Sequence, residues 1–175
     1  LVTATTAFIS RHYGAQEHDA VGLIVQQSLY IGLVFSLAIS AFGLFFSKDL
    51  LMLLGANEPV ALLGSAYLSV LFLGIFTMVE LWVVISSFQA CGNSFTPMIL
   101  MVGVNIINIM LNPVLIFGLF GFPAFGVAGS ALATILSRGA GLVMGMLLLV
   151  RYSSHITFPK IHSPDFRLIR KILAV

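Results

Sequence analysis

Long apolar stretches separated by short polar loops make up most of the chain. A helix needs about 20 consecutive apolar residues to cross the hydrocarbon core of a bilayer. Four stretches are long enough, at residues 22–46, 61–90, 98–120 and 127–152, and a shorter one at 1–12 resembles the end of a further helix. The pattern therefore predicts an all-α, polytopic transmembrane bundle with four full spans and one partial span.

The composition agrees with a location in the membrane. Hydrophobic residues make up 59% of the chain and charged residues 8%, with a mean hydropathy of +1.11. A soluble domain carries about 25% charged residues, so we predict an integral membrane protein. The net charge of +2 gives no reason to expect a nucleic-acid partner, and the single cysteine excludes an intramolecular disulfide. Because the sequence opens inside an apolar run, without a methionine or a signal-peptide pattern, we expect a piece of a longer protein.

Basic residues near the loops predict the orientation, because cytoplasmic loops carry more Lys and Arg than outer loops. Only Lys48 lies in the loops of one side, whereas the other side and its flanks carry six basic residues. These six are Arg11, Arg151, Lys160, Arg167, Arg170 and Lys171. We therefore expect the loops at 47–60 and 121–126 to face outward from the cytoplasmic (inner) membrane. The tail at 153–175 is then cytoplasmic, and its apolar and basic faces suit an amphipathic helix on the membrane surface.

A stripe of asparagines stands out in the third full span. Asn105, Asn108 and Asn112 are spaced i, i+3 and i+7 inside a window, residues 81–137, that contains no charged residue or histidine. This spacing places the three side chains on one face of a helix. Pro113 follows directly and has no N–H to give to the preceding turn, so we expect it to kink the helix and leave a carbonyl free. Such polar groups need an internal partner in lipid.

Two interpretations of the stripe remain open. Asparagine side chains often hold membrane helices together, each hydrogen bond contributing about 0.6 kcal/mol on average. Alternatively, Asn108 and Asn112 form a site for a cation or substrate with Ser130 and Thr134 of the next helix. Oxygen ligands beside a proline-freed carbonyl suit a hard cation, so these four residues are the candidate cation ligands.

Glu80 and Arg138 are the acid and the base that lie well inside the spans. An intramembrane acid usually faces a pathway or a proton relay, although a structural pairing remains an alternative. Counted from the ends of their spans at about 1.5 Å per residue, the two side chains lie at similar depth. We therefore hypothesise that they pair, since either charge alone in lipid costs at least about 2.5 kcal/mol.

Small residues recur in the last predicted span and the turn before it. Gly129 begins a run of small residues, and Gly141 and Gly145 form a small-xxx-small spacing. Such faces let helix backbones approach closely in membranes. We predict packing surfaces there, not ligand sites.

Several short motifs, taken in order and spacing, resemble the multidrug and toxic compound extrusion (MATE) transporters over essentially the whole chain. The most distinctive is Asn112-Pro113 followed by Ile116-Phe117-Gly118. The others are Leu54-Gly55-Ala56, Gly92-Asn93, Thr96-Pro97-Met98, Gly129-Ser130-Ala131-Leu132-Ala133-Thr134 and Ser137-Arg138. The resemblance implies twelve helices in two six-helix lobes. Residues 1–152 would then belong to the N-terminal lobe, incomplete at its start, and residues 153–175 would form the cytoplasmic linker toward the second lobe.

The resemblance also implies a function. MATE proteins are secondary active transporters that export cationic or amphiphilic drugs by alternating access, in antiport with Na⁺ or H⁺. Some prokaryotic members carry an aspartate directly before the proline, where this chain has Asn112. Because an amide cannot titrate, Glu80 is the acid of these spans that is able to carry a proton. Arg138, Asn105 and Pro113 are expected to take part in transport or coupling with Glu80, and Asn108 and Asn112 to coordinate or orient.

Three other functions compete with multidrug efflux. A related flippase or polysaccharide exporter for lipid-linked substrates would favour a more basic cavity than Arg138 alone provides. An intramembrane enzyme would need His, Asp or Cys groups converging inside the spans, and the sequence supplies none, so we expect no catalytic residue and no cofactor besides a coupling ion. A purely structural subunit would not explain Glu80, Arg138 and the asparagines together.

Overall fold

The computed structural model describes residues 2–151, and the tail helix predicted at 153–175 lies outside the described residues. Within that range the chain is helical and contains no strand. The helices are α1 (Val2–Gly14), α2 (His18–Leu53), α3 (Glu58–Leu73), α4 (Ile75–Ala90), α5 (Phe95–Phe117), the short 3₁₀ helix η1 (Leu119–Gly121) and α6 (Val127–Arg151). The predicted all-α class is confirmed.

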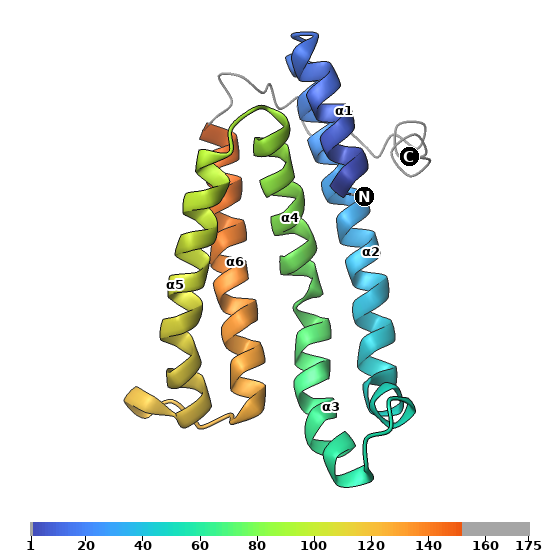
Figure 1. Cartoon of the computed structure of the whole chain (residues 1–175), viewed down its shortest axis with the longest axis vertical. Helices are drawn as coiled ribbons and strands as arrows, with labels where there is room; N and C mark the ends of the chain where they lie inside the picture. The colour runs from blue at the N-terminus through green and yellow to red at the C-terminus, as the bar shows by residue number, and fades with distance from the viewer. Residues whose placement is uncertain (1, 152–175) are drawn as a thin grey trace.

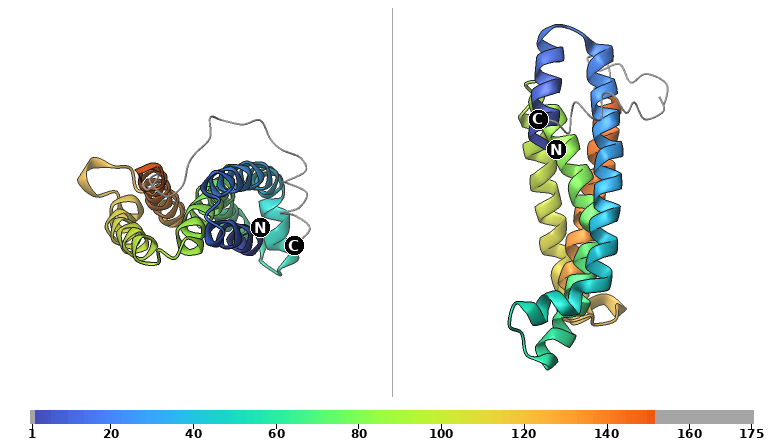
Figure 2. Two further views of the ribbon diagram at one scale, coloured as in Figure 1. Left: turned by 90° about the horizontal axis from the view of Figure 1, so that it is seen from above. Right: turned by 90° about the vertical axis from the view of Figure 1, so that its right-hand side faces the viewer.

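The long helices run up and down along one axis (Figure 1). The α1–α2 and α4–α5 connections and the end of α6 lie at one end, and the α2–α3 connection and η1 lie at the other. This grouping of the connections by end agrees with the alternation of loops predicted from the sequence. Figure 2, seen from above, shows α5 and α6 side by side and α1 beside α2 across the molecule. Helix α4 contacts α1, α2 and α6, so it joins the two groups.

The second predicted span, 61–90, is not one helix as expected. It is divided at Gly74 into α3 and α4, which meet at a bend of 40°. Two hydroxyl groups bond to carbonyls at the break: Ser40 donates to Phe72 at 2.6 Å and Thr77 donates to Gly74 at 2.8 Å. A Cβ at Gly74 would lie 2.2 Å from Cγ1 of Ile135, so a larger residue there would require the Ile135 side chain of α6 to move. Among the described residues, three helices are long and apolar enough to span a membrane, or four spans if α3 and α4 count as one.

Helix α5 passes through Pro113 and ends three residues before the predicted boundary of 120. Gly118 stops it in the left-handed conformation, at φ +73°, where a side chain would be strained. The following turn folds back onto the helix: the N–H of Phe125 donates to the carbonyl of Leu115 at 3.0 Å, and the N–H of Gly126 to that of Ile116 at 3.2 Å. The turn thereby satisfies carbonyls that the helix end leaves open.

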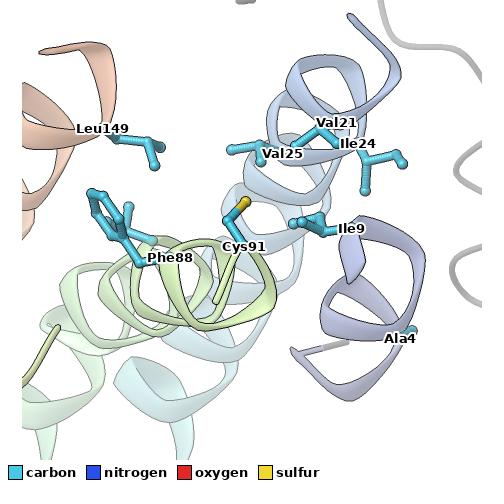
Figure 3. Packing of buried hydrophobic residues seen from close by; sticks show 9 residues of the cluster. Ala4, Ile9, Val21, Ile24, Val25, Phe88, Cys91 and Leu149 are labelled. Atoms are coloured by element: carbon cyan, nitrogen blue, oxygen red, sulfur yellow. The ribbon is translucent and has the colours of Figure 1, made fainter. Parts of the chain in front are cut away.

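Buried apolar side chains fill the spaces between the helices. One cluster joins α1, α2, α4 and α6 through Ile9, Val25, Phe88 and Leu149, with Cys91 among them, and Figure 3 shows these side chains gathered between the ribbons. A second cluster joins α4 and α5. Much of the remaining apolar surface faces outward, as expected for helices in lipid.

The small residues predicted to form packing surfaces do so. An added Cβ would lie 2.4 Å from the carbonyl oxygen of Leu115 at Gly129, and 2.3 Å from Cγ2 of Val104 at Gly141. At Gly145 it would lie 2.9 Å from Cγ1 of Val84. Through these glycines, α6 packs closely against both α5 and α4.

Candidate functional site

Asn108 links α5 to α6. Its amide nitrogen lies 3.4 Å from the hydroxyl oxygen of Thr134 and 3.4 Å from that of Ser137, and donates to both. The contact between Asn108 and Thr134 agrees with the predicted grouping. Ser137 was not among the predicted ligands, although its spacing of three residues from Thr134 on one helix face could have revealed it.

Asn112 bonds within its own helix. Its amide nitrogen donates to the backbone carbonyl and to the side-chain oxygen of Asn108, both at 2.9 Å. The two asparagines therefore form a continuous polar ladder, one turn apart. The oxygen of the Asn108 side chain is already an acceptor in this ladder.

The hydroxyl groups of α6 donate to carbonyls of their own helix. Ser130 donates to Val127 at 2.8 Å, and Thr134 donates to Ser130 at 2.9 Å. Ser137 donates to Thr134 at 3.0 Å. Asn112, Asn108, Thr134 and Ser130 are therefore linked in one chain of hydrogen bonds, which Ser130 joins through its backbone carbonyl.

A pocket of about 230 Å³ opens between α4, α5 and α6. Its apolar wall includes Met78 and Trp82 of α4 and Met101 of α5. Its polar wall is made by Asn105, Asn108, Thr134, Ser137 and Arg138. The pocket thus unites two of the predicted cation ligands with Asn105 and Arg138, whereas Asn112 and Ser130 do not line it. We call it the α4–α6 pocket.

Arg138 also lines a second pocket, of about 260 Å³, beside the break at Gly74. Its guanidinium makes no hydrogen bond or ion pair with any residue between 2 and 151. The ion pairs in this range are instead near the loops: His12 with Glu17 at 2.6 Å and Lys48 with Glu58 at 3.6 Å. Arg138 is therefore a positive charge that the other residues between 2 and 151 leave uncompensated.

Glu80 lies on α4 and is only 4% exposed. It faces α2, where a Cβ added to Gly32 would lie 2.8 Å from Oε1 of the glutamate. The adjoining pocket, of about 250 Å³, is lined by apolar side chains and by Tyr30. Within residues 2–151, Oε1 has no hydrogen-bond partner. Glu80 is thus buried in an almost wholly apolar environment.

The predicted pair between Glu80 and Arg138 is not formed in the described structure. Glu80 lines the pocket beside α2, whereas Arg138 lines the two pockets on the other side of α4. Similar depth along the bundle does not fix which way a side chain points, and that direction separates the two groups here. The depth count also assumed an unbroken helix before Glu80, which the bend at Gly74 removes.

The described residues contain no group of three or more His, Cys, Asp or Glu side chains that could hold a metal ion. A cation in the α4–α6 pocket would meet the guanidinium of Arg138 as well as amide and hydroxyl oxygens. The arrangement therefore suits polar or anionic groups of a ligand better than it suits a bare cation.

The comparisons with known proteins agree with the helical arrangement. The family model described as MatE matches residues 1–114. The probable multidrug resistance protein YoeA of Bacillus subtilis is 28% identical over 173 residues, which are 99% of this chain and 37% of that protein. A solved inward-facing conformation of a multidrug resistance MATE family transporter of the MOP superfamily is 27% identical, with a TM-score of 0.87, over 99% of this chain and 39% of that one.

An outward-facing conformation described in the same words is 26% identical, with a TM-score of 0.85, over 99% of this chain and 38% of that one. The chain therefore spans less than half the length of these relatives. The fold of the chain is similar to the matched part of both the inward-facing and the outward-facing structure.

Proposed function

The chain belongs to the MatE family, and from this premise we propose that the complete protein is a secondary active transporter that exports amphiphilic or cationic organic compounds. The observation that carries the proposal is Glu80, a buried carboxyl group whose Oε1 has no partner in the described structure. Membrane proteins seldom keep such a group without a role in coupling or transport. The similarity of the chain to relatives that are named for multidrug resistance supports organic compounds as the substrate class.

A second lobe would complete this transporter, with the described helices forming most of the first. The similarity of this lobe to both inward-facing and outward-facing relatives supports movement as a nearly rigid unit. Alternating access would then come from a change in how the two lobes meet. The excess of basic residues on one side of the predicted spans supports an inner-membrane protein whose tail is cytoplasmic.

Protons are the coupling ions in this proposal, and Glu80 carries them. Tyr30 on α2 is the other titratable side chain that lines its pocket, while α6 contributes Leu142 and Met146, and no charged side chain faces it from either helix. An ionised side chain in the membrane costs at least about 2.5 kcal/mol, so Glu80 holds a proton while the pocket is closed. Opening the pocket to water stabilises the carboxylate and releases the proton.

Sodium coupling at Asn108, Asn112, Ser130 and Thr134 is the alternative. Their oxygen atoms would suit a hard cation. The hydrogen bonds within this set and the neighbouring charge of Arg138 count against it. A flippase for lipid-linked substrates is a further alternative, which Arg138 as the base of the α4–α6 pocket does not by itself favour.

Dye export from proteoliposomes containing the complete transporter tests the proposal. A proton gradient is expected to drive export by the wild type, and Glu80→Gln is expected to abolish that response. Glu58→Gln is the matched control, because it removes an acid of an exposed surface pair at the start of α3. Export driven by sodium alone and unaffected by Glu80→Gln would overturn proton coupling. Export of no dye under either gradient would overturn the transport function itself.

A further inference from the structure

The uncompensated charge of Arg138 points to the chemistry of the ligand in the α4–α6 pocket. We propose that this pocket binds the carboxylate or phosphate group of an amphiphilic substrate, with Arg138 as the specificity-determining residue. The inference rests on the proposed export function and deepens it, because it assigns zwitterionic and anionic amphiphiles to the substrate range, beside plain organic cations.

The hydrogen-bond donors of the pocket suit an anionic group of a ligand. The guanidinium of Arg138 presents five N–H groups in a plane that matches a carboxylate or phosphate. Asn105, which is exposed, offers an amide without a hydrogen-bond partner in the described chain. The hydroxyl hydrogens of Thr134 and Ser137 are already donated to carbonyls. The side-chain donors left for a ligand are therefore those of Arg138 and Asn105 and the indole N–H of Trp82.

The charges around the pocket also favour an anion over a cation. No acidic side chain lines either pocket that Arg138 reaches, and Glu80 lies in the separate pocket beside α2. A cation entering the α4–α6 pocket would meet a positive charge in a medium of low dielectric constant, where repulsion is strong. A carboxylate would meet a charge that it neutralises.

The shape of the pocket defines the rest of the ligand. Trp82, Met78 and Met101 supply apolar surface beside the polar groups of the pocket. Methionine and tryptophan side chains pack well against aromatic bodies of varied shape. An aromatic compound with one acidic substituent therefore fits both walls at once.

The depth of Arg138 separates a substrate from a lipid headgroup as the source of the anion. It lies near the middle of α6, Val127–Arg151. Lipid phosphates lie outside the hydrocarbon core, which is about 30 Å thick. A small amphiphile that enters the bundle can bring its acidic group to this depth, so we assign the site to the substrate.

A matched pair of dyes tests the assignment by binding to the purified complete transporter in detergent. One dye is a rhodamine with a free carboxylate, and the other is its methyl ester, a plain cation. Fluorescence anisotropy gives the ratio of the two dissociation constants. Arg138→Gln is expected to weaken binding of the carboxylate dye about tenfold or more, with the ester unaffected or bound more tightly. Arg138→Lys keeps the charge and should retain part of the preference.

Two further variants keep the test decisive. Asn105→Ala changes an exposed side chain, so it should fold even if Arg138→Gln does not, and it should weaken only the carboxylate dye. Lys48→Gln removes a positive charge at the surface and should change neither dissociation constant. Phosphatidylglycerol, added as a competitor, should not displace the carboxylate dye from the wild type.

Three results would contradict the inference that Arg138 binds the acidic group of the substrate. Equal weakening of both dyes by Arg138→Gln would show that the arginine pairs with an acid elsewhere in the transporter, and would overturn the inference. So would a wild type that binds the carboxylate dye no better than Arg138→Gln does, or Arg138-dependent displacement by the lipid. Export of the ester under a proton gradient would still support the proposed function in these cases, so the two failures are distinguishable.

Discussion

Replacing Gly129 with alanine should destabilise the lobe, although alanine is the better helix former. The added Cβ would lie 2.4 Å from the carbonyl oxygen of Leu115, 2.7 Å from its carbonyl carbon and 3.0 Å from the backbone nitrogen of Ile116. These neighbours are backbone atoms, which cannot move aside like the end of a flexible side chain. Helices α5 and α6 must therefore separate by about 1 Å to restore ordinary contact, which lies at roughly 3.5 Å or more.

The expected magnitude follows from the cost of overpacking. Forcing an extra methyl group into a well-packed site typically costs about 1–3 kcal/mol. Separation would also strain the backbone hydrogen bond from Phe125 to Leu115, which closes the turn onto the end of α5. We expect Gly129→Ala to lie near the upper end of this range.

Gly139→Ala on the same helix is the matched control. Its Cβ would have only Cγ2 of Thr77 nearby, at 3.8 Å, which is an ordinary contact. Alanine should therefore be neutral there or stabilise α6 by about 0.5–1 kcal/mol through helix propensity. Unfolding of the complete transporter in increasing SDS, followed by tryptophan fluorescence, compares the two variants with the wild type. If Gly129→Ala is as stable as Gly139→Ala, the close α5–α6 packing is refuted.

Three further predictions concern other parts of the lobe. Ser40→Ala should remove the hydroxyl that bonds to Phe72 at the α3–α4 break and lower stability by about 1 kcal/mol, measured in the same SDS assay; an unchanged midpoint would contradict it. Asn112→Leu should lose two hydrogen bonds and about 1 kcal/mol of stability without changing the response of export to sodium, whereas a lost sodium response would favour the predicted cation site. Burial raises the pKa of the Cys91 thiol to about 11, so at neutral pH a maleimide should label it only after unfolding, and rapid labelling of the folded protein would show that the cluster around it is open.

The sequence was sufficient to predict the helical class and the surfaces along which α6 packs. Long apolar runs have few alternatives to helices in a membrane, and the spacing of Gly141 and Gly145 indicates one helix face directly. The break at Gly74 was not predictable in the same way, because a single glycine inside an apolar run is common in unbroken helices. Its effect depends on Ser40 and Ile135, which approach it only in the folded bundle.

The sequence predicted only part of the candidate site, because the directions of its side chains depend on the folded bundle. Periodicity predicted the helix face on which Asn108 lies, and the order of the helices placed α6 next to α5. The contact between Asn108 and Thr134 follows from these two features. The directions of Glu80 and Arg138 depend on how each helix is rotated about its axis, which depth along the sequence does not specify. The hypothesis of a Glu80–Arg138 pair was wrong because the two side chains point into different pockets. We therefore assign separate roles to the two residues.

If Glu80 carries the coupling proton, a substrate gradient must move protons across the membrane, and that movement can be measured. Proteoliposomes containing the complete transporter and a trapped pH-sensitive dye would receive a gradient of a transported cationic dye and no pH gradient. We expect a change in lumenal pH for the wild type and for Glu58→Gln, and none for Glu80→Gln. The same proton flux in Glu80→Gln as in the wild type would contradict it.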